Sequence, residues 1–151
     1  MTSTDRIEKQ VQLRASRARV WRALTNADEF GAWFRVKLDG PFVEGAATRG
    51  RLTFPGYEHL TMTMDIARIE PESLFAYRWH PYAMDAKVDY SNETPTLVEF
   101  RLEDADGGTR LSIVESGFDS LPAGRRDEAF RMNDGGWTQQ TKNLAAYVAH
   151  A

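Results

Sequence analysis

The sequence contains no cysteine, and this absence removes several kinds of chemistry at once. Without thiols there are no disulfides, no thiolate zinc sites, no cysteine nucleophile and no cysteine-ligated iron–sulfur cluster. An excess of positive charge is also missing, because 19 basic residues stand against 22 acidic ones, which gives a net charge of −3. Basic residues form no run longer than Arg125-Arg126. The chain therefore lacks the electrostatic footprint of a nucleic-acid-binding protein.

Long apolar runs are missing as well. No stretch approaches the roughly 20 apolar residues that a membrane span requires, so we expect no membrane insertion. The segment Met1 to Arg6 is short and polar, without the apolar region of a signal peptide, which predicts a cytoplasmic protein. With 151 residues, the chain fits a single domain, 1–151, whose core needs no staples.

Recognisable catalytic and cofactor motifs are also absent. The three histidines, His59, His80 and His150, form no HExxH and have no partner at metal-ligand spacing. We interpret them as surface histidines. The sequence has neither GxGxxG nor GxxxxGK[ST], and no GxSxG. We therefore expect no metal and no cofactor.

Aromatic rings are what the chain has in quantity. It carries 4 Trp, 5 Tyr and 8 Phe, although hydrophobic residues make up only 42% of the sequence. The apolar mass therefore lies in large rings rather than in aliphatic side chains.

Alternation of apolar and polar residues with a period of two indicates half-buried strands. Such segments lie at about 7–13, 48–54, 59–69, 74–80, 97–103 and 109–115. Between the last two, Asp106-Gly107-Gly108 predicts a hairpin turn. Strands joined by short turns pair antiparallel, and one apolar face per strand means one covered face.

Helical spacing of apolar residues predicts three helices. Ser16 can cap one over about 17–25, a second covers about 27–33, and a long one runs from about 125 to 149. The long helix is the expected cover of the sheet, which gives an α+β class. Gly135-Gly136 inside it predicts either a break between two helices or a close approach of the helix backbone to a strand or a ligand.

Several segments, in order along the chain, resemble one known family. They are 11–34 (VQLRASRARVWRALTNADEFGAWF), 69–71 (IEP), 74–79 (LFAYRW), 96–102, 107–111 (GGTRL), 115–118 (ESGF), and Gly136-Trp137 followed by Leu144 and Tyr147. This set resembles the helix-grip fold of the START-like (SRPBCC) superfamily and, within it, the homologues of the activator of heat-shock protein ATPase.

The resemblance implies a curved antiparallel sheet of about seven strands wrapped around a long C-terminal helix, with two short helices after the first strand. Such proteins enclose a largely apolar cavity between sheet and helix. Relatives bind lipids, sterols, polyketides or other aromatic molecules, and a few are cyclases or dehydratases. The namesake members stimulate a chaperone ATPase with the help of an additional domain, for which 151 residues leave no room.

The alternation along the strands and the helical spacing predict that many large side chains point into the space between sheet and helix. Flexible methionines and rings suit an apolar pocket, although each residue taken alone fits an ordinary core equally well. The candidate ligand-binding residues are Trp33, Phe34, Phe54, Met62, Met64, Phe75, Tyr77, Trp79, Phe100, Glu115, Phe130, Asn133 and Trp137. Gln140 and Thr141 could add polar contacts.

Glu115 is the one candidate for acid–base chemistry. Strict alternation places it on the inward face with Leu111 and Ile113, where a carboxylate would be desolvated. Lys9 interrupts the inward face of the first strand, and the helix-grip topology makes the first and last strands neighbours. Lys9 and Glu115 could therefore form an ion pair. The alternatives are a structural pair at the rim or a bulge that turns Glu115 outward.

Three functions follow as hypotheses. The first is a binding protein, not an enzyme, that carries a small hydrophobic or aromatic ligand such as a lipid, polyketide or flavonoid-like molecule. The second is a cyclase or dehydratase with Glu115 as general acid or base. The third is a protein-interaction module with a chaperone partner. In each case we expect a monomer or homodimer.

Overall fold

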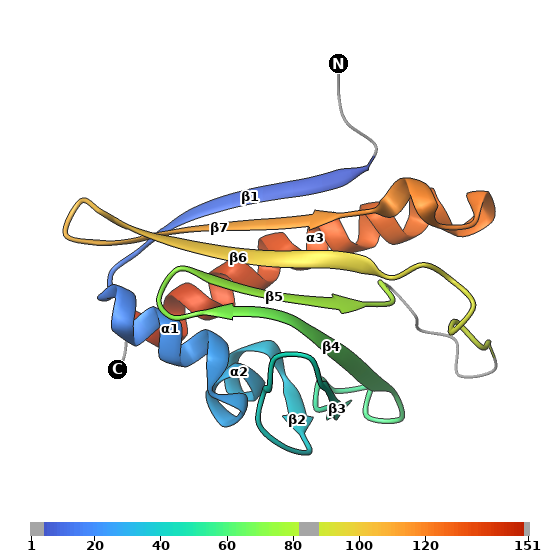
Figure 1. Cartoon of the computed structure of the whole chain (residues 1–151), viewed down its shortest axis with the longest axis horizontal. Helices are drawn as coiled ribbons and strands as arrows, with labels where there is room; N and C mark the ends of the chain where they lie inside the picture. The colour runs from blue at the N-terminus through green and yellow to red at the C-terminus, as the bar shows by residue number, and fades with distance from the viewer. Residues whose placement is uncertain (1–4, 82–87, 150–151) are drawn as a thin grey trace.

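The computed structural model describes residues 5–81 and 88–149, which form one antiparallel sheet and three α-helices (Figure 1). The spatial order of its strands is β1-β7-β6-β5-β4-β3-β2. The strands are β1 (Arg6–Leu13), β2 (Val36–Leu38), β3 (Ala47–Leu52), β4 (Thr61–Glu70), β5 (Leu74–Trp79), β6 (Thr96–Ala105) and β7 (Gly108–Ser116). The predicted α+β class with a curved antiparallel sheet is confirmed.

The two short helices follow β1, as expected. Helix α1 (Arg17–Thr25) begins where the Ser16 hydroxyl accepts a hydrogen bond from the Arg19 backbone, and α2 (Ala27–Phe34) begins in the same way at Asn26. The chain then turns back at once into β2. At Gly31 a Cβ atom would lie 2.2 Å from the Val36 carbonyl oxygen, so only glycine permits this close return.

The long helix α3 (Ala123–Ala149) crosses one face of the sheet, and Figure 1 shows it lying behind β5, β6 and β7. Its Trp137, Leu144 and Val148 are buried against the sheet. A 3-10 turn, η1 (Phe118–Ser120), connects β7 to the helix. The helix runs through Gly135-Gly136 without interruption, so the predicted break between two helices is wrong.

Sequence patterning located most elements closely. In the hairpin between β6 and β7, Asp106 and Gly107 have φ angles of 51° and 80°. Positive φ at both positions gives the two-residue turn a twist that matches the right-handed twist of the flanking strands. One expectation at the β3 end is wrong, because Phe54 follows β3 instead of belonging to it, and it is 50% exposed. The strand β2 was not predicted, because its three residues are too few to show alternation.

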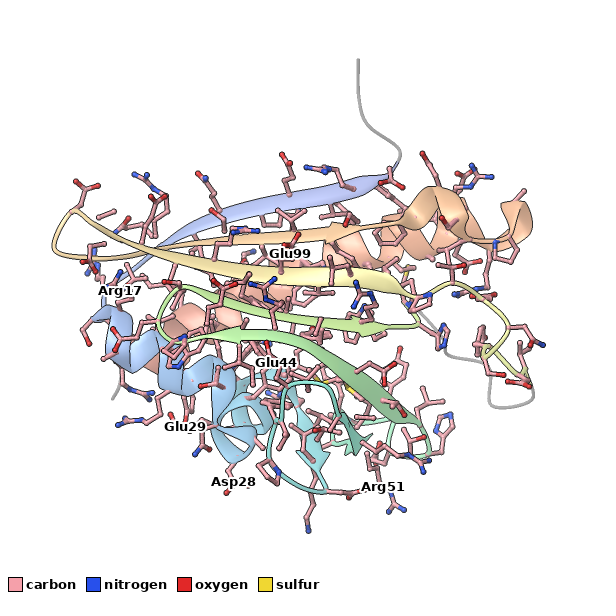
Figure 2. The ribbon with its side chains drawn as sticks, in the orientation of Figure 1. Arg17, Asp28, Glu29, Glu44, Arg51 and Glu99 are labelled. Atoms are coloured by element: carbon pink, nitrogen blue, oxygen red, sulfur yellow. The ribbon has the colours of Figure 1, made fainter. Side chains whose placement is uncertain are left out.

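Charged side chains cover the outside of the molecule, and Figure 2 shows Asp28 and Arg51 pointing away from it. His59 is exposed, His80 is half-buried, and His150 lies outside the described residues. Among the described residues, no helix combines the length and apolarity that crossing a membrane would require.

Candidate functional site

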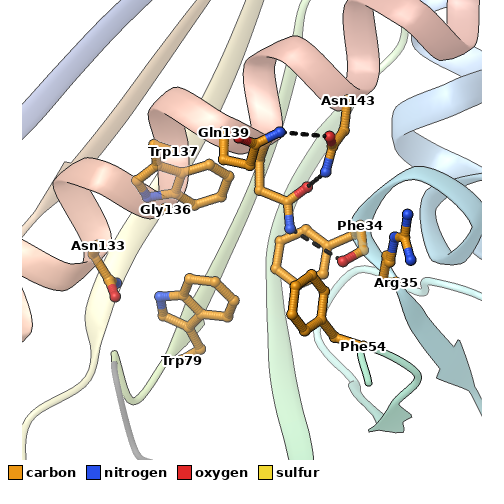
Figure 3. Close-up of a pocket in the computed structure, with 10 residues that line it drawn as sticks. Phe34, Arg35, Phe54, Trp79, Asn133, Gly136, Trp137, Gln139 and Asn143 are labelled. Atoms are coloured by element: carbon orange, nitrogen blue, oxygen red, sulfur yellow. Dashed lines mark hydrogen bonds between the residues drawn. The ribbon is translucent and has the colours of Figure 1, made fainter. Parts of the chain in front are cut away.

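A pocket of about 280 Å³ lies at one edge of the space between the sheet and α3. It is bounded by α3, by the end of α2, by the loop after β3 and by the end of β5 (Figure 3). Its lining consists of Phe34, Arg35, Phe54, Trp79, Asn133, Gly136, Trp137, Gln139, Gln140 and Asn143.

The contribution of α3 follows from helical geometry. Asn133, Gly136, Gln140 and Asn143 are spaced three, four and three residues apart, which places them on one face of the helix. Gly136 is exposed on this face and borders the pocket, and a Cβ atom built there would meet nothing within 4 Å, so the open space over it is here called the hollow. The predicted close approach of the helix backbone to a strand is therefore wrong, and its approach to a ligand stays a prediction.

Three rings from different elements form the inner wall of the pocket. Phe34 of α2, Trp79 of β5 and Trp137 of α3 have ring centroids 5.8–6.3 Å apart, in tilted and edge-on arrangements. Phe54 adds a fourth ring at the mouth. Aromatic pairs in such geometries hold one another in fixed orientations.

The Glu115 carboxylate lies behind the two indoles and accepts four hydrogen bonds. One oxygen accepts from Trp79 Nε1 at 2.7 Å and from Thr96 Oγ1 at 2.6 Å. The other accepts from Asn133 Nδ2 at 2.9 Å and from Trp137 Nε1 at 2.8 Å. Indole and amide N–H groups can only donate hydrogen bonds, so both carboxylate oxygens of Glu115 act as acceptors.

Full burial and four donors give Glu115 a positioning role in this geometry. It fixes the N–H edges of both indoles, so that their carbocyclic edges face the pocket (Figure 3). Glu115 itself is not part of the pocket lining. The expected ion pair with Lys9 is wrong, because the Lys9 ammonium instead pairs with Asp134 of α3 at 2.9 Å.

Tyr77 lies fully buried beneath this region. Its hydroxyl has no hydrogen-bond partner among the described residues. Burial, and then the nearby Glu115 carboxylate, raise the pKa of Tyr77 well above its usual value, so the phenol stays neutral.

A chain of amides closes the α3 side of the mouth (Figure 3). Gln139 donates to Asn143 at 3.0 Å, Asn143 donates to Gln140 at 3.1 Å, and Gln140 donates to the Phe34 carbonyl at 3.1 Å. These bonds tie α3 to the end of α2.

The predicted site residues divide into three groups. Phe34, Phe54, Trp79, Asn133 and Trp137 line the pocket. Glu115 lies behind it, as described. The remainder fill the interior or pack against it: Trp33, Met64, Phe75, Tyr77 and Phe100 are buried, whereas Met62 and Phe130 are half-buried. The interior is thus largely packed by rings, and the open space lies at its edge.

Sequence reasoning missed Arg35, Gln139 and Asn143. The helical spacing from Asn133 to Asn143 is the signal that could have found Asn143. No sequence signal marks Arg35, which reaches the pocket because it ends α2 in a left-handed conformation (φ 73°, ψ 57°). Among the described residues, His, Asp and Glu form no group of three or more that could hold a metal ion.

Comparison with known families agrees with this geometry. The sequence profile described as "Activator of Hsp90 ATPase homolog 1-like protein" matches residues 14–149. The chain belongs to this family. As a member of the Activator of Hsp90 ATPase homolog 1-like family, it has the START-like helix-grip fold. A search of curated protein sequences finds no match.

Solved structures of similar fold share little sequence with this family member. Protein MLL2253 from Mesorhizobium loti superposes with a TM-score of 0.76 at 20% identity, over 97% of this chain and 98% of that one. The Aha1 dimer from Colwellia psychrerythraea gives 0.70 at 16% identity, over 95% of each chain. DynU16, from the dynemicin biosynthetic locus, gives 0.71 at 21% identity, over 96% of this chain and 47% of that one.

Proposed function

We propose that this protein binds a small, largely apolar aromatic molecule in the pocket beside α3. The observation that carries the proposal is the hollow at Gly136, which is faced by aromatic rings held in place from behind by Glu115. A volume of about 280 Å³ lies near the lower end of the range typical of ligand pockets, which favours a compact ligand of two or three fused rings.

Binding without covalent chemistry is favoured over catalysis. The described residues that line the pocket include no His, Lys, Ser, Asp or Glu, so they supply none of the usual nucleophiles and acid–base groups. The carboxylate that could have served as acid or base has no contact with the pocket. Among the structural relatives, DynU16 comes from a biosynthetic locus, which supports a small molecule as ligand.

Two adjacent glycines provide the test. Both sit in α3 with free space at the Cβ position, but only Gly136 lines the pocket. A leucine at either position suits the helix better than glycine, whereas only Gly136→Leu fills the hollow. With 2-naphthamide as probe in an NMR titration, we expect Gly136→Leu to weaken binding about tenfold or more, and Gly135→Leu to leave it within about twofold.

The same titration locates the probe. Amide shift changes are expected at Phe34, Trp79 and the Gly136 turn of α3. Shift changes confined to the opposite face of the sheet, or equal affinity in the two leucine variants, would contradict the proposal.

A further inference from the structure

One cation lies at the pocket mouth. Among the described residues that line the pocket, Arg35 is the charged one. A cation at the border of an apolar pocket can select a negatively charged group on the ligand.

The Arg35 guanidinium is free to receive a ligand. Among residues 5–81 and 88–149 it takes part in no ion pair, whereas many other arginines of the chain do. The neighbouring amides of Gln140 and Asn143 are occupied with each other and with the Phe34 carbonyl. Within the described part of the chain, Arg35 is thus the strongest donor at the mouth whose guanidinium makes no hydrogen bond or ion pair.

The position of this cation is fixed by the fold. The Arg35 backbone N–H donates to Gly31 at the end of α2, and its carbonyl accepts from the Thr53 backbone at 2.9 Å. The guanidinium carbon lies 5.7 Å from the centre of the Phe54 ring, a cation–π contact that holds it beside the mouth. An arginine anchored in this way loses less freedom when it binds an anion.

The opposite end of the pocket has the opposite polarity. In Figure 3, Arg35 and Asn133 lie at opposite ends of the pocket, and Asn133 and the indole N–H groups point to the buried Glu115 carboxylate. An anion would be repelled from the Glu115 end and attracted to Arg35. The two charges thus impose one orientation on a ligand that is apolar at one end and negative at the other.

We propose that the ligand is an aromatic carboxylate, whose rings lie against the wall formed by Trp79, Trp137 and Phe34 and whose carboxylate binds Arg35. This inference rests on the proposed function and deepens it by naming the chemical class. The planar guanidinium can donate two parallel hydrogen bonds to a carboxylate, which an uncharged amide of the same shape cannot match.

The experiment compares 2-naphthoate with its uncharged isostere 2-naphthamide, by NMR titration of the whole protein at neutral pH and low salt. We expect the wild type to bind 2-naphthoate about tenfold more tightly. Arg35→Gln is expected to abolish this preference, and Arg35→Lys to keep part of it. Raising the salt concentration should reduce the preference.

Arg51→Gln is the matched control, because it removes the same charge from an exposed position on β3 that points away from the molecule (Figure 2). It should keep the full preference for 2-naphthoate. Equal binding of the two probes, or a preference that survives Arg35→Gln, would overturn the inference and leave the proposed function standing. Binding of neither probe would overturn both. Tighter binding of decanoate than of 2-naphthoate would overturn the aromatic class and indicate a fatty acid as ligand.

Discussion

Glu115 is a buried carboxylate satisfied entirely by neutral donors. A lone ionised group in an apolar interior is very costly unless hydrogen bonds replace its hydration. Here Trp79, Thr96, Asn133 and Trp137 supply these bonds from β5, β6 and α3. One residue of β7 thereby fixes the relative positions of the elements that wall the pocket.

Replacing this carboxylate is expected to destabilise the protein. In Glu115→Gln one oxygen is replaced by an NH₂ group, which cannot accept hydrogen bonds. Up to two buried donors therefore lose their partner, and the free energy of unfolding should fall by about 2–4 kcal/mol. Urea denaturation followed by tryptophan fluorescence measures it. The control is Glu99→Gln on β6, whose carboxylate forms a surface pair with Arg101 and should cost less than about 1 kcal/mol. Equal losses in both variants would contradict the positioning role.

At the scale of elements, a second carboxylate joins the three helices. Glu29 of α2 accepts from Arg19 and Arg22 of α1, both at 2.7 Å, and from the Tyr147 hydroxyl of α3 at 3.0 Å. Burial acts to raise the pKa of Glu29, but the hydrogen bonds from Tyr147 and Arg19 outweigh it, so the pKa lies below its ordinary value. The ionised form is thus stabilised in the folded protein.

This shift predicts a pH dependence of stability. A carboxyl whose pKa is lowered by folding adds stability above its unfolded pKa, and this stability is lost as the pH falls through the folded value. Glu29→Gln should lower the free energy of unfolding by about 1–2 kcal/mol at pH 7, and the difference from wild type should shrink toward pH 3. Urea denaturation at both pH values tests this, and a difference that stays constant would contradict it.

At the scale of the whole molecule, a filled pocket should stabilise the fold, because the site is assembled from α2, α3, β5 and the loop after β3. None of these elements forms the site alone, so the ligand binds the folded protein and not the unfolded chain. Ligand binding and unfolding are therefore linked.

We expect 2-naphthoate at about 100 times its Kd to add about 2.7 kcal/mol to the free energy of unfolding. For a chain of this length this raises Tm by roughly 5–10 °C. Differential scanning calorimetry at the same free ligand concentration should show a much smaller rise for Gly136→Leu. Equal increases in Tm for the two proteins would place the binding elsewhere.

The sequence by itself determined the elements and the side of the sheet on which each side chain lies. Alternation and helical spacing act between near neighbours in the chain, so β1, α1, the β6–β7 hairpin and the inward direction of Glu115 follow from local pattern. The same patterns predicted the set of inward-facing residues to which four of the rings that line the pocket belong.

Only the tertiary structure decided which of these rings are core and which border the open space. The alternation along β5 predicts that Phe75 and Trp79 face inward, but how deeply each is buried depends on where α3 crosses the sheet, and α3 begins more than 40 residues later in the chain. Lys9 pairs with α3 rather than with its neighbouring strand for the same reason. Arg35 reaches the mouth only because the end of α2 and the loop after β3 meet in space. Contacts between segments that are far apart in the chain produce no periodic pattern in the sequence. The pocket is formed by such contacts, so the sequence alone did not reveal it.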